Sequence, residues 1–267
     1  MNSAHVLDLF KLTKKVVLVS GGAKGLGTAI NEGVLEAGAN TLILCGRGRH
    51  GSLEDEQDRL SDLFPSAKII AVQCDVSNES EVKSLIKKIK DDVDRIDILV
   101  NNAGVTWNAP TIDQTLETWH RVIDTNLTGL FLLTREVANE LMIPKGGGTI
   151  INISSTLAFQ GVEVGSQIGY SASKAGVLGL TRQLAIEWSK WNIRVNAIAP
   201  SFIEGDTMAK VFTNELSPMR ETLIEMIPTH RFNKPTDIKA AVCFLASEAS
   251  SNITGQYVVI DGGMSVK

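Results

Sequence analysis

The chain has 267 residues, of which 43% are apolar and 21% are charged, and its formal net charge is −4. This composition supplies enough apolar side chains for a large core and excludes a disordered chain. The mildly acidic balance, without a dense stripe of lysine and arginine, argues against binding to a nucleic-acid backbone.

The N-terminal residues and the cysteines bear on where the protein works. Residues 1–10 show no charged segment followed by an apolar one, and no apolar run in the chain reaches the ~18 residues that cross a membrane. We therefore expect a cytoplasmic protein with no membrane partner. Cys45, Cys74 and Cys243 are odd in number, lie in apolar stretches and lack the spacing of metal ligands, so we expect core residues and no metal site.

The first predicted strand, Lys15–Ser20, is a short apolar run of the kind that parallel sheets bury on both faces. The glycine-rich turn Gly21–Gly27 follows at once and opens a helix that continues to Glu36, with Gly38 as its cap. This arrangement suits a phosphate site, because bare backbone can approach the ligand and the helix N-terminus favours an anion. The spacing is not G-x-G-x-x-G, and such a turn alone is more often just a tight connection.

Two cations lie where a nucleotide-binding fold holds the adenine ribose. The second predicted strand, Thr41–Cys45, is followed by Gly46 and Arg47, about 20 residues beyond the glycine turn. An acid at Gly46 would hold the ribose hydroxyls and repel a 2′-phosphate, but that acid is missing. Lys24 in the glycine turn is the second cation. Together the two cations favour a 2′-phosphate; the alternative is that both are solvated surface residues.

Further strands and helices alternate along the rest of the chain. Seven strands in such an alternation predict a parallel, doubly wound sheet with helices on both faces. Functional residues are then expected at the carboxyl ends of the strands. The remaining predicted elements are helix 52–64, strand 68–74, helix 79–91, strand 96–100, helical segments over 116–141, strand 149–153, helix 170–189, strand 193–198 and strand 257–261.

Tyr170 and Lys174 open the strongest predicted helix and, being four residues apart, lie on one face of it. A free phenol has a pKa of ~10, and a nearby cation lowers that pKa by favouring the phenolate. Ser155, after the preceding strand, could hydrogen-bond the oxygen that gains or loses the proton. The alternative is an ordinary helix start with a satisfied phenol and a solvated lysine.

From Lys11 to Gly263 the chain resembles the short-chain dehydrogenase/reductase family. The resemblance implies a three-layer doubly wound (Rossmann) fold in one domain, 1–267, with a small substrate lid at about 203–231. Its motifs are Ser20-Gly-Gly-Ala-Lys-Gly-Leu-Gly27, Asp75-Val76, Asn101-Asn-Ala-Gly104, Thr125-Asn126, Ser155, Tyr170-x-x-x-Lys174, Asn196-Ala-Ile-Ala-Pro200 and Ile253-Thr-Gly255.

The family pattern implies a role for each catalytic residue. Tyr170 is the acid-base residue, and Ser155 orients the substrate carbonyl. Lys174 lowers the phenol pKa and binds the nicotinamide ribose, and Asn126 holds a water of the proton relay. We choose Ser155 over Ser154 because the motif places the catalytic serine after the last inward residue of the strand. The implied cofactor-binding residues are Gly21, Lys24, Gly25, Leu26, Gly27, Arg47, Asp75, Val76, Asn102, Ala103, Gly104, Tyr170, Lys174, Pro200 and Ile203.

The sequence departs from the family pattern after the sixth strand. The usual Pro-Gly is Pro200-Ser201, and the threonine often found five residues after the proline is Gly205, with Thr207 as a possible substitute. The gap from Ser155 to Tyr170 is about two residues longer than in many relatives. These departures fall where the family pattern implies contacts to the nicotinamide amide and the pyrophosphate; the backbone of Ile203 would still face the carboxamide.

The segment after the sixth strand bears on the substrate. The stretch from Glu204 to His230 has apolar residues at helical spacing, which indicates either a helix face packed on a core or a lid over the substrate. Similarity to enzymes of the gluconate 5-dehydrogenase type keeps a polar substrate open. The apolar lid residues are Met208, Phe212, Met219, Leu223, Met226 and Ile227, and Trp107, Leu157, Phe159 and Phe202 could complete the wall.

We therefore predict an NADP(H)-dependent oxidoreductase that interconverts a ketone and a secondary alcohol, with NAD(H) as the less favoured cofactor. Alternatives are a sugar-acid or polyol dehydrogenase, a 3-oxoacyl-thioester reductase, and a catalytically silent nucleotide-binding scaffold. The resemblance also implies a homotetramer in which the Tyr170 and Asn126 helices pair across a two-fold axis. Small residues on the Tyr170 helix, namely Ala172, Ala175, Gly176 and Gly179, suit this pairing or tight packing within the subunit.

Overall fold

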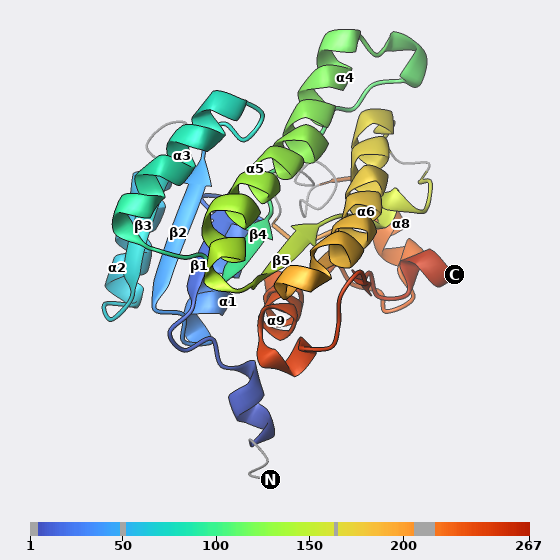
Figure 1. The fold of residues 1–267 in the computed structure, drawn as a ribbon. Helices are drawn as coiled ribbons and strands as arrows, with labels where there is room; N and C mark the ends of the chain where they lie inside the picture. The colour runs from blue at the N-terminus through green and yellow to red at the C-terminus, as the bar shows by residue number, and fades with distance from the viewer. Residues whose placement is uncertain (1–4, 49–51, 163–164, 206–216) are drawn as a thin grey trace.

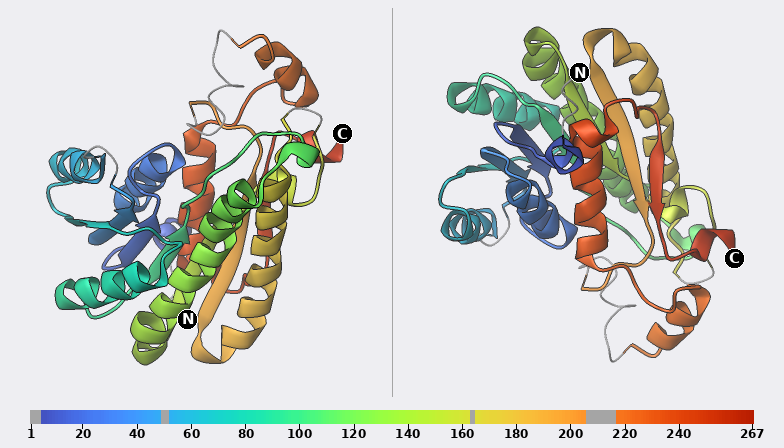
Figure 2. Two further views of the ribbon diagram at one scale, coloured as in Figure 1. Left: turned by 90° about the horizontal axis from the view of Figure 1, so that it is seen from above. Right: turned by 90° about the horizontal axis from the view of Figure 1, so that it is seen from below.

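A parallel sheet lies between two layers of helices (Figures 1 and 2). The computed structural model describes residues 5–48, 52–162, 165–205 and 217–267. Seven parallel strands follow the order β3-β2-β1-β4-β5-β6-β7, which confirms the predicted doubly wound sheet. The strands are β1 (Val16–Ser20), β2 (Thr41–Gly46), β3 (Lys68–Gln73), β4 (Ile98–Asn101), β5 (Gly148–Ile153), β6 (Ile193–Pro200) and β7 (Tyr257–Ile260).

Helices cover both faces of the sheet. α1, α2 and α9 pack on one face, and α3, α5 and α6 pack on the other. α8 lies beyond the layers, near the carboxyl ends of the strands. The helices are α1 (Leu26–Glu36), α2 (Ser52–Leu63), α3 (Glu79–Asp92), α4 (Leu116–Ile123), α5 (Gly129–Val137), α6 (Ile168–Trp188), α8 (Arg220–Met226) and α9 (Pro235–Ala246).

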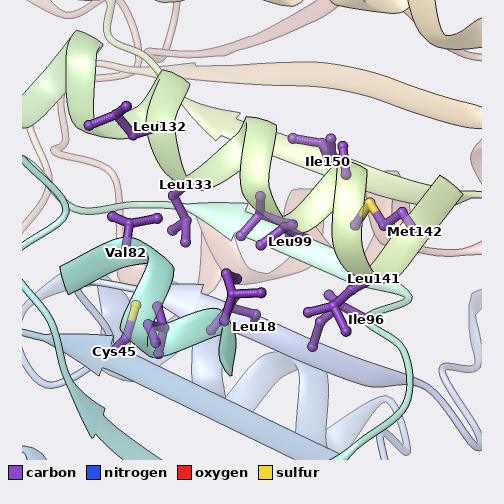
Figure 3. Close-up of a cluster of buried hydrophobic side chains, with 14 of the residues drawn as sticks. Leu18, Cys45, Val82, Ile96, Leu99, Leu132, Leu133, Leu141, Met142 and Ile150 are labelled. Atoms are coloured by element: carbon purple, nitrogen blue, oxygen red, sulfur yellow. The ribbon is translucent and has the colours of Figure 1, made fainter. Parts of the chain in front are cut away.

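The alternation of side chains along each strand divides the core in two. In β1, Val17 and Val19 join the cluster under α1, α2 and α9, whereas Leu18 joins the cluster under α3, α5 and α6. Figure 3 shows Leu18 in the second cluster, beside Leu99 and Leu133. Because both faces are covered, the strands read as continuous apolar runs.

The cysteines form no disulfide, and Cys45 and Cys74 are buried core residues, as predicted. Burial raises the pKa of both thiols, that of Cys74 to about 12. Cys243 is half-buried, with its Sγ 3.2 Å from the carbonyl oxygen of Gly33. None of the helices that the structure describes combines the length and the apolar character needed to cross a bilayer.

Two features were not expected from the sequence. The helical run over 116–141 is interrupted by segments with π-helical hydrogen bonding at Asp124–Thr128 and Ala138–Met142. Helix α9 was not predicted, although it begins with Pro235 and carries a capping carboxylate at Asp237. Both are common signals of a helix start.

Candidate active site

A cavity of about 360 Å³ lies at the carboxyl ends of the strands. Strand register puts Ser20 level with Cys45 on one side and Asn101 on the other, so the loops after β1, β2 and β4 leave the sheet side by side. Gly25, Gly27 and Asn126 are predicted site residues that do not line this cavity directly. The predicted residues that do line it are Gly21, Lys24, Leu26, Arg47, Asp75, Val76, Asn102, Ala103, Gly104, Ser155, Tyr170, Lys174, Pro200 and Ile203.

The glycine turn brings bare backbone to the cavity. Gly21 and Gly25 have φ values of +65° and +57°, a region that residues with a Cβ rarely adopt. A Cβ on Gly27 would lie only 2.2 Å from the carbonyl oxygen of Gly21, so only glycine lets α1 start this close to the turn. The result is a helix N-terminus opening onto the cavity, which favours an anion.

Asn102 holds the glycine turn against the loop after β4. Its Nδ2 donates to the carbonyl oxygens of Ser20 (3.2 Å) and Gly21 (3.0 Å). In return, the hydroxyl of Ser20 accepts hydrogen bonds from the backbone N–H groups of Asn102 (3.1 Å) and Ala103 (3.2 Å). The sequence assigned Asn102 to cofactor binding, and these contacts add that it fixes one cavity wall to another.

Positive charge prevails among the charged residues of the cavity wall. Lys24 is exposed and Arg47 is half-buried, and neither forms an ion pair with any residue that the structure describes. Lys174 is the third cation, and Asp75 is the one carboxylate among the described lining residues. Its Oδ1 accepts from the N–H of Ser77 (3.0 Å) and from the Ser77 hydroxyl (2.6 Å). The wall is therefore suited to an anionic ligand.

Tyr170 and Lys174 lie on the same side of α6, as their spacing predicts. The Nζ of Lys174 is 5.4 Å from the centre of the Tyr170 ring and donates a 2.7 Å hydrogen bond to the carbonyl oxygen of Ile153. Lys174 is only 3% exposed, so its charge acts in a region with little screening water. The alternative of a solvated surface lysine is wrong.

The two adjacent serines have different partners. The hydroxyl of Ser154 donates to the carbonyl oxygen of Lys174 (2.9 Å), which commits its hydrogen to the backbone of α6. The hydroxyl of Ser155 accepts from the N–H of Leu157 (3.2 Å), and this bond leaves its own hydrogen free to point to a ligand. Both residues line the cavity, and the contacts favour Ser155 as the donor to a substrate oxygen.

Asn126 lies in the first π segment and is fully buried. Its Oδ1 accepts from the N–H of Val105 (2.8 Å), and its Nδ2 donates to the carbonyl oxygen of Val105 (2.9 Å) and to the hydroxyl of Ser173 (3.1 Å). A Cβ at Gly104 would lie 3.4 Å from this Oδ1 and 3.7 Å from Lys174 Nζ. The two polar atoms therefore border the same small space.

Several residues of the cavity wall were not anticipated. They include Ala23, Gly48, Ser52 and Val105. Ser52 could have been found from the sequence, because it is the first residue of α2, the helix that follows β2 and Arg47. A helix N-terminus in such a place favours an anionic ligand. The position of Val105, by contrast, follows from its two hydrogen bonds with Asn126, and nothing local in the sequence indicates these.

The expected apolar wall is placed only in part. Met208, Phe212 and Thr207 lie outside the described residues. Leu223 and Ile227 are buried with Phe232 and Met264 in a small cluster of their own, so for them the alternative of a helix face packed on a core is correct. The remaining candidates are absent from the described cavity wall: Trp107, Leu157, Phe159, Phe202, Met219 and Met226.

Comparison with known proteins gives matches over most of the chain. A family model described as enoyl-(acyl carrier protein) reductase matches residues 21–265. The chain is 38% identical to the 3-oxoacyl-(acyl-carrier-protein) reductase FabG of Aquifex aeolicus, over 95% of this chain and 98% of that protein. It is 34% identical to an NAD-dependent glycerol dehydrogenase of Listeria innocua, over 97% of this chain and 96% of that one.

Comparison with solved structures shows that the fold is shared as well. A gluconate 5-dehydrogenase from Burkholderia cenocepacia, in complex with NADP and tartrate, superposes with a TM-score of 0.91 at 29% identity, covering 98% of this chain and 100% of that one. The family match and the shared fold thus define a nicotinamide-dependent oxidoreductase. The chain belongs to the short-chain dehydrogenase/reductase family.

Proposed function

We propose that this protein is an NADP(H)-dependent oxidoreductase that interconverts a ketone and a secondary alcohol, with Tyr170 as the general acid and base. One observation carries the proposal: a single cavity joins Lys24 and Arg47, beside β1 and β2, to Ser155, Tyr170 and Lys174, beside β5. One end of the cavity therefore suits an anion, and the other end suits proton transfer.

The residues present fit a dinucleotide. Bare backbone at Gly21–Gly27 and the N-terminus of α1 suit the pyrophosphate, and we assign Asp75 and Val76, which line the same cavity, to the adenine side. We assign five lining residues to the nicotinamide side: Asn102, Ala103, Gly104, Pro200 and Ile203. We assign the contacts with the nicotinamide ribose to Tyr170 and Lys174. Once bound, the nicotinamide supplies or accepts the hydride.

The chain's own residues handle the proton. The hydroxyl of Tyr170 gives a proton to the carbonyl oxygen in reduction and takes one from the alcohol in oxidation. The buried ammonium of Lys174 favours the phenolate form of Tyr170. Ser155 donates a hydrogen bond to the same substrate oxygen and so fixes the reacting carbon.

Proton supply to this pair would pass beside Gly104. Lys174 Nζ and Asn126 Oδ1 border one small space there, and Oδ1 retains a lone pair beyond its bond to Val105. A water in that space could accept from Lys174 and donate to Asn126. Since both amide hydrogens of Asn126 are already used, the water would bind the oxygen of the side chain.

The choice of NADP(H) rests on Lys24, Arg47 and Gly46. Two cations without ion pairs among the described residues, and no acid at the end of β2, suit a 2′-phosphate. The Listeria relative is NAD-dependent, whereas the Burkholderia structure carries NADP, so these two proteins do not name the same cofactor. The cofactor preference must therefore be measured for this chain.

An activity screen would identify the class of substrate. We propose to compare simple ketones, sugar acids and 3-oxoacyl thioesters with NADPH and with NADH, following the absorbance of the reduced nicotinamide. The Aquifex relative supports the thioester arm and the Burkholderia structure supports the sugar-acid arm. Cofactor binding without turnover on any arm would favour the silent scaffold instead.

Two further proposals concern the whole chain. We assign residues 1–267 to one domain with a substrate lid at about 203–231, of which residues 206–216 lie outside the described part of the chain. A β-bridge joins Ile203, which starts this segment and lines the cavity, to Asn233, just beyond its other end. We also propose that the protein is a homotetramer that pairs through α5 and α6.

A further inference from the structure

Ser173 is a fully buried hydroxyl between two parts of the site. It donates a 2.7 Å hydrogen bond to the carbonyl oxygen of Tyr170, three residues earlier in α6. It also accepts a 3.1 Å hydrogen bond from Nδ2 of Asn126, in the π segment between α4 and α5. The backbone of the proposed acid-base residue and the proposed relay asparagine are thus joined through one oxygen atom.

The contacts of Asn126 define which way its amide points. The N–H of Val105 needs an acceptor and its carbonyl oxygen needs a donor, so exchanging the amide oxygen and nitrogen would break both bonds. The second amide hydrogen points to Ser173. Without the serine oxygen, this hydrogen would be buried without a partner in a residue that has no exposed surface.

We propose that Ser173 is a positioning residue that acts through Asn126. By holding the amide from the side of α6, it keeps Asn126 Oδ1 beside the space that Lys174 Nζ also borders. Its second bond, to the carbonyl oxygen of Tyr170, ties that position to the first turn of α6. This inference rests on the proposed function, because it assigns Asn126 to proton transfer.

The same helix offers a matched control in Thr181. Thr181 is 1% exposed, and its hydroxyl donates to the carbonyl oxygen of Val177 (2.8 Å) and accepts from Nδ2 of Asn152 (3.0 Å). Like Ser173, it bonds an earlier carbonyl of α6 and a buried asparagine amide. Thr181 is absent from the described cavity wall. Removing its hydroxyl therefore breaks two similar hydrogen bonds at a distance from the proposed reaction.

The experiment compares Ser173→Ala with Thr181→Val, using NADPH and the ketone that the wild-type protein reduces fastest in the screen. We expect Ser173→Ala to lower kcat by roughly 10- to 100-fold, as misplaced catalytic groups do, with KM for NADPH unchanged. Thr181→Val should keep a kcat close to that of the wild type at a similar loss of thermal stability. If Ser173→Ala does not fold, Ser173→Cys keeps the size of the side chain and weakens both bonds.

A double-mutant cycle tests whether Ser173 acts through Asn126. Adding Ser173→Ala to Asn126→Ala should lower kcat no further, because the group that Ser173 holds is already gone. Additive losses, or a kcat loss no larger than that of Thr181→Val, would overturn the inference. Tyr170→Phe measured in parallel separates the two claims: an inactive Tyr170→Phe beside an unimpaired Ser173→Ala leaves the proposed function standing.

Discussion

Gly46 is the residue where the cofactor preference can be reversed with least disturbance. No atom lies within 4 Å of the position that its Cβ would take, so Gly46→Asp adds a carboxylate without repacking. Each charge-assisted phosphate contact is worth roughly 1.5–3 kcal/mol, so a wild-type preference of about 100-fold for NADPH is expected. The aspartate should reduce or reverse this preference in kcat/KM.

Gly46→Asn controls for the size of the new side chain. It should retain the preference for NADPH, because it brings no negative charge next to Arg47. If the wild-type protein has the same kcat/KM with NADH as with NADPH, the assignment of Lys24 and Arg47 to a 2′-phosphate is wrong.

Lys174 combines two proposed roles that one substitution removes together. Lys174→Met keeps an unbranched side chain but loses the buried charge and the bond to the carbonyl oxygen of Ile153. We expect weaker NADPH binding and slower turnover, with the pH profile of alcohol oxidation displaced to higher pH because the phenolate loses its neighbouring cation. Cofactor titration together with that profile checks both effects, and an unchanged profile would remove Lys174 from proton transfer.

At the residue scale, the sequence predicted what depends on spacing along the chain. Tyr170 and Lys174 face one way because helix geometry requires it, and Ser155 follows β5, a strand that can be recognised from its apolar run. The environment of Asn126 was not predictable, because its bonds to Val105 and Ser173 join segments far apart in sequence. Nothing in the spacing of Tyr170-x-x-x-Lys174 indicates the contacts of Ser173.

At the element scale, strands and most helices were predicted within a few residues, since apolar runs and alternation define them. The π segments were missed, because a shift in backbone hydrogen bonding carries no sequence signal of its own. Gly176 shows a similar limit: a Cβ there would lie 2.8 Å from a methyl group of Leu127, so packing within the subunit explains this glycine. The small size of Gly176 alone could not distinguish packing within the subunit from contact with a partner helix.

The start of α9 gives a prediction about stability and pH. Asp237 accepts from the N–H of Lys234 (2.8 Å), and its short hydrogen bond with Arg231 (2.6 Å) lowers the pKa of its carboxyl. The stabilisation is therefore present above the unfolded pKa of ~3.9 and is lost as the pH falls through the lower folded value. Asp237→Asn should lower the free energy of unfolding by about 1 kcal/mol at neutral pH, and this difference should shrink below about pH 4.

Denaturant titrations at several pH values would measure this effect. Asp58→Asn, on the exposed face of α2, is a control that should leave stability unchanged. A destabilisation by Asp237→Asn that persists undiminished at low pH would show that the ionised carboxylate is not its source.

At the scale of the whole molecule, α6 offers a face for association. Ala175, Gly179 and Ile186 lie on one face by helical spacing; Ile186 is 76% exposed, and a Cβ on Gly179 would meet no atom within 4 Å. α5 lies beside α6 and presents a half-exposed Phe131 (Figures 1 and 2). We expect sedimentation velocity to show a tetramer that Gly179→Arg dissociates. A wild-type monomer at assay concentration would contradict this.

The central claim is that Tyr170 transfers the proton, and the kcat of Tyr170→Phe tests it most directly. The substitution removes one oxygen from an otherwise intact cavity, so the fold and NADPH binding should persist. On a ketone that the wild-type protein reduces, kcat should fall by at least the ~10²–10⁴-fold typical of lost acid-base catalysis. A Tyr170→Phe protein that binds NADPH normally and keeps more than about a tenth of the wild-type kcat would contradict the account.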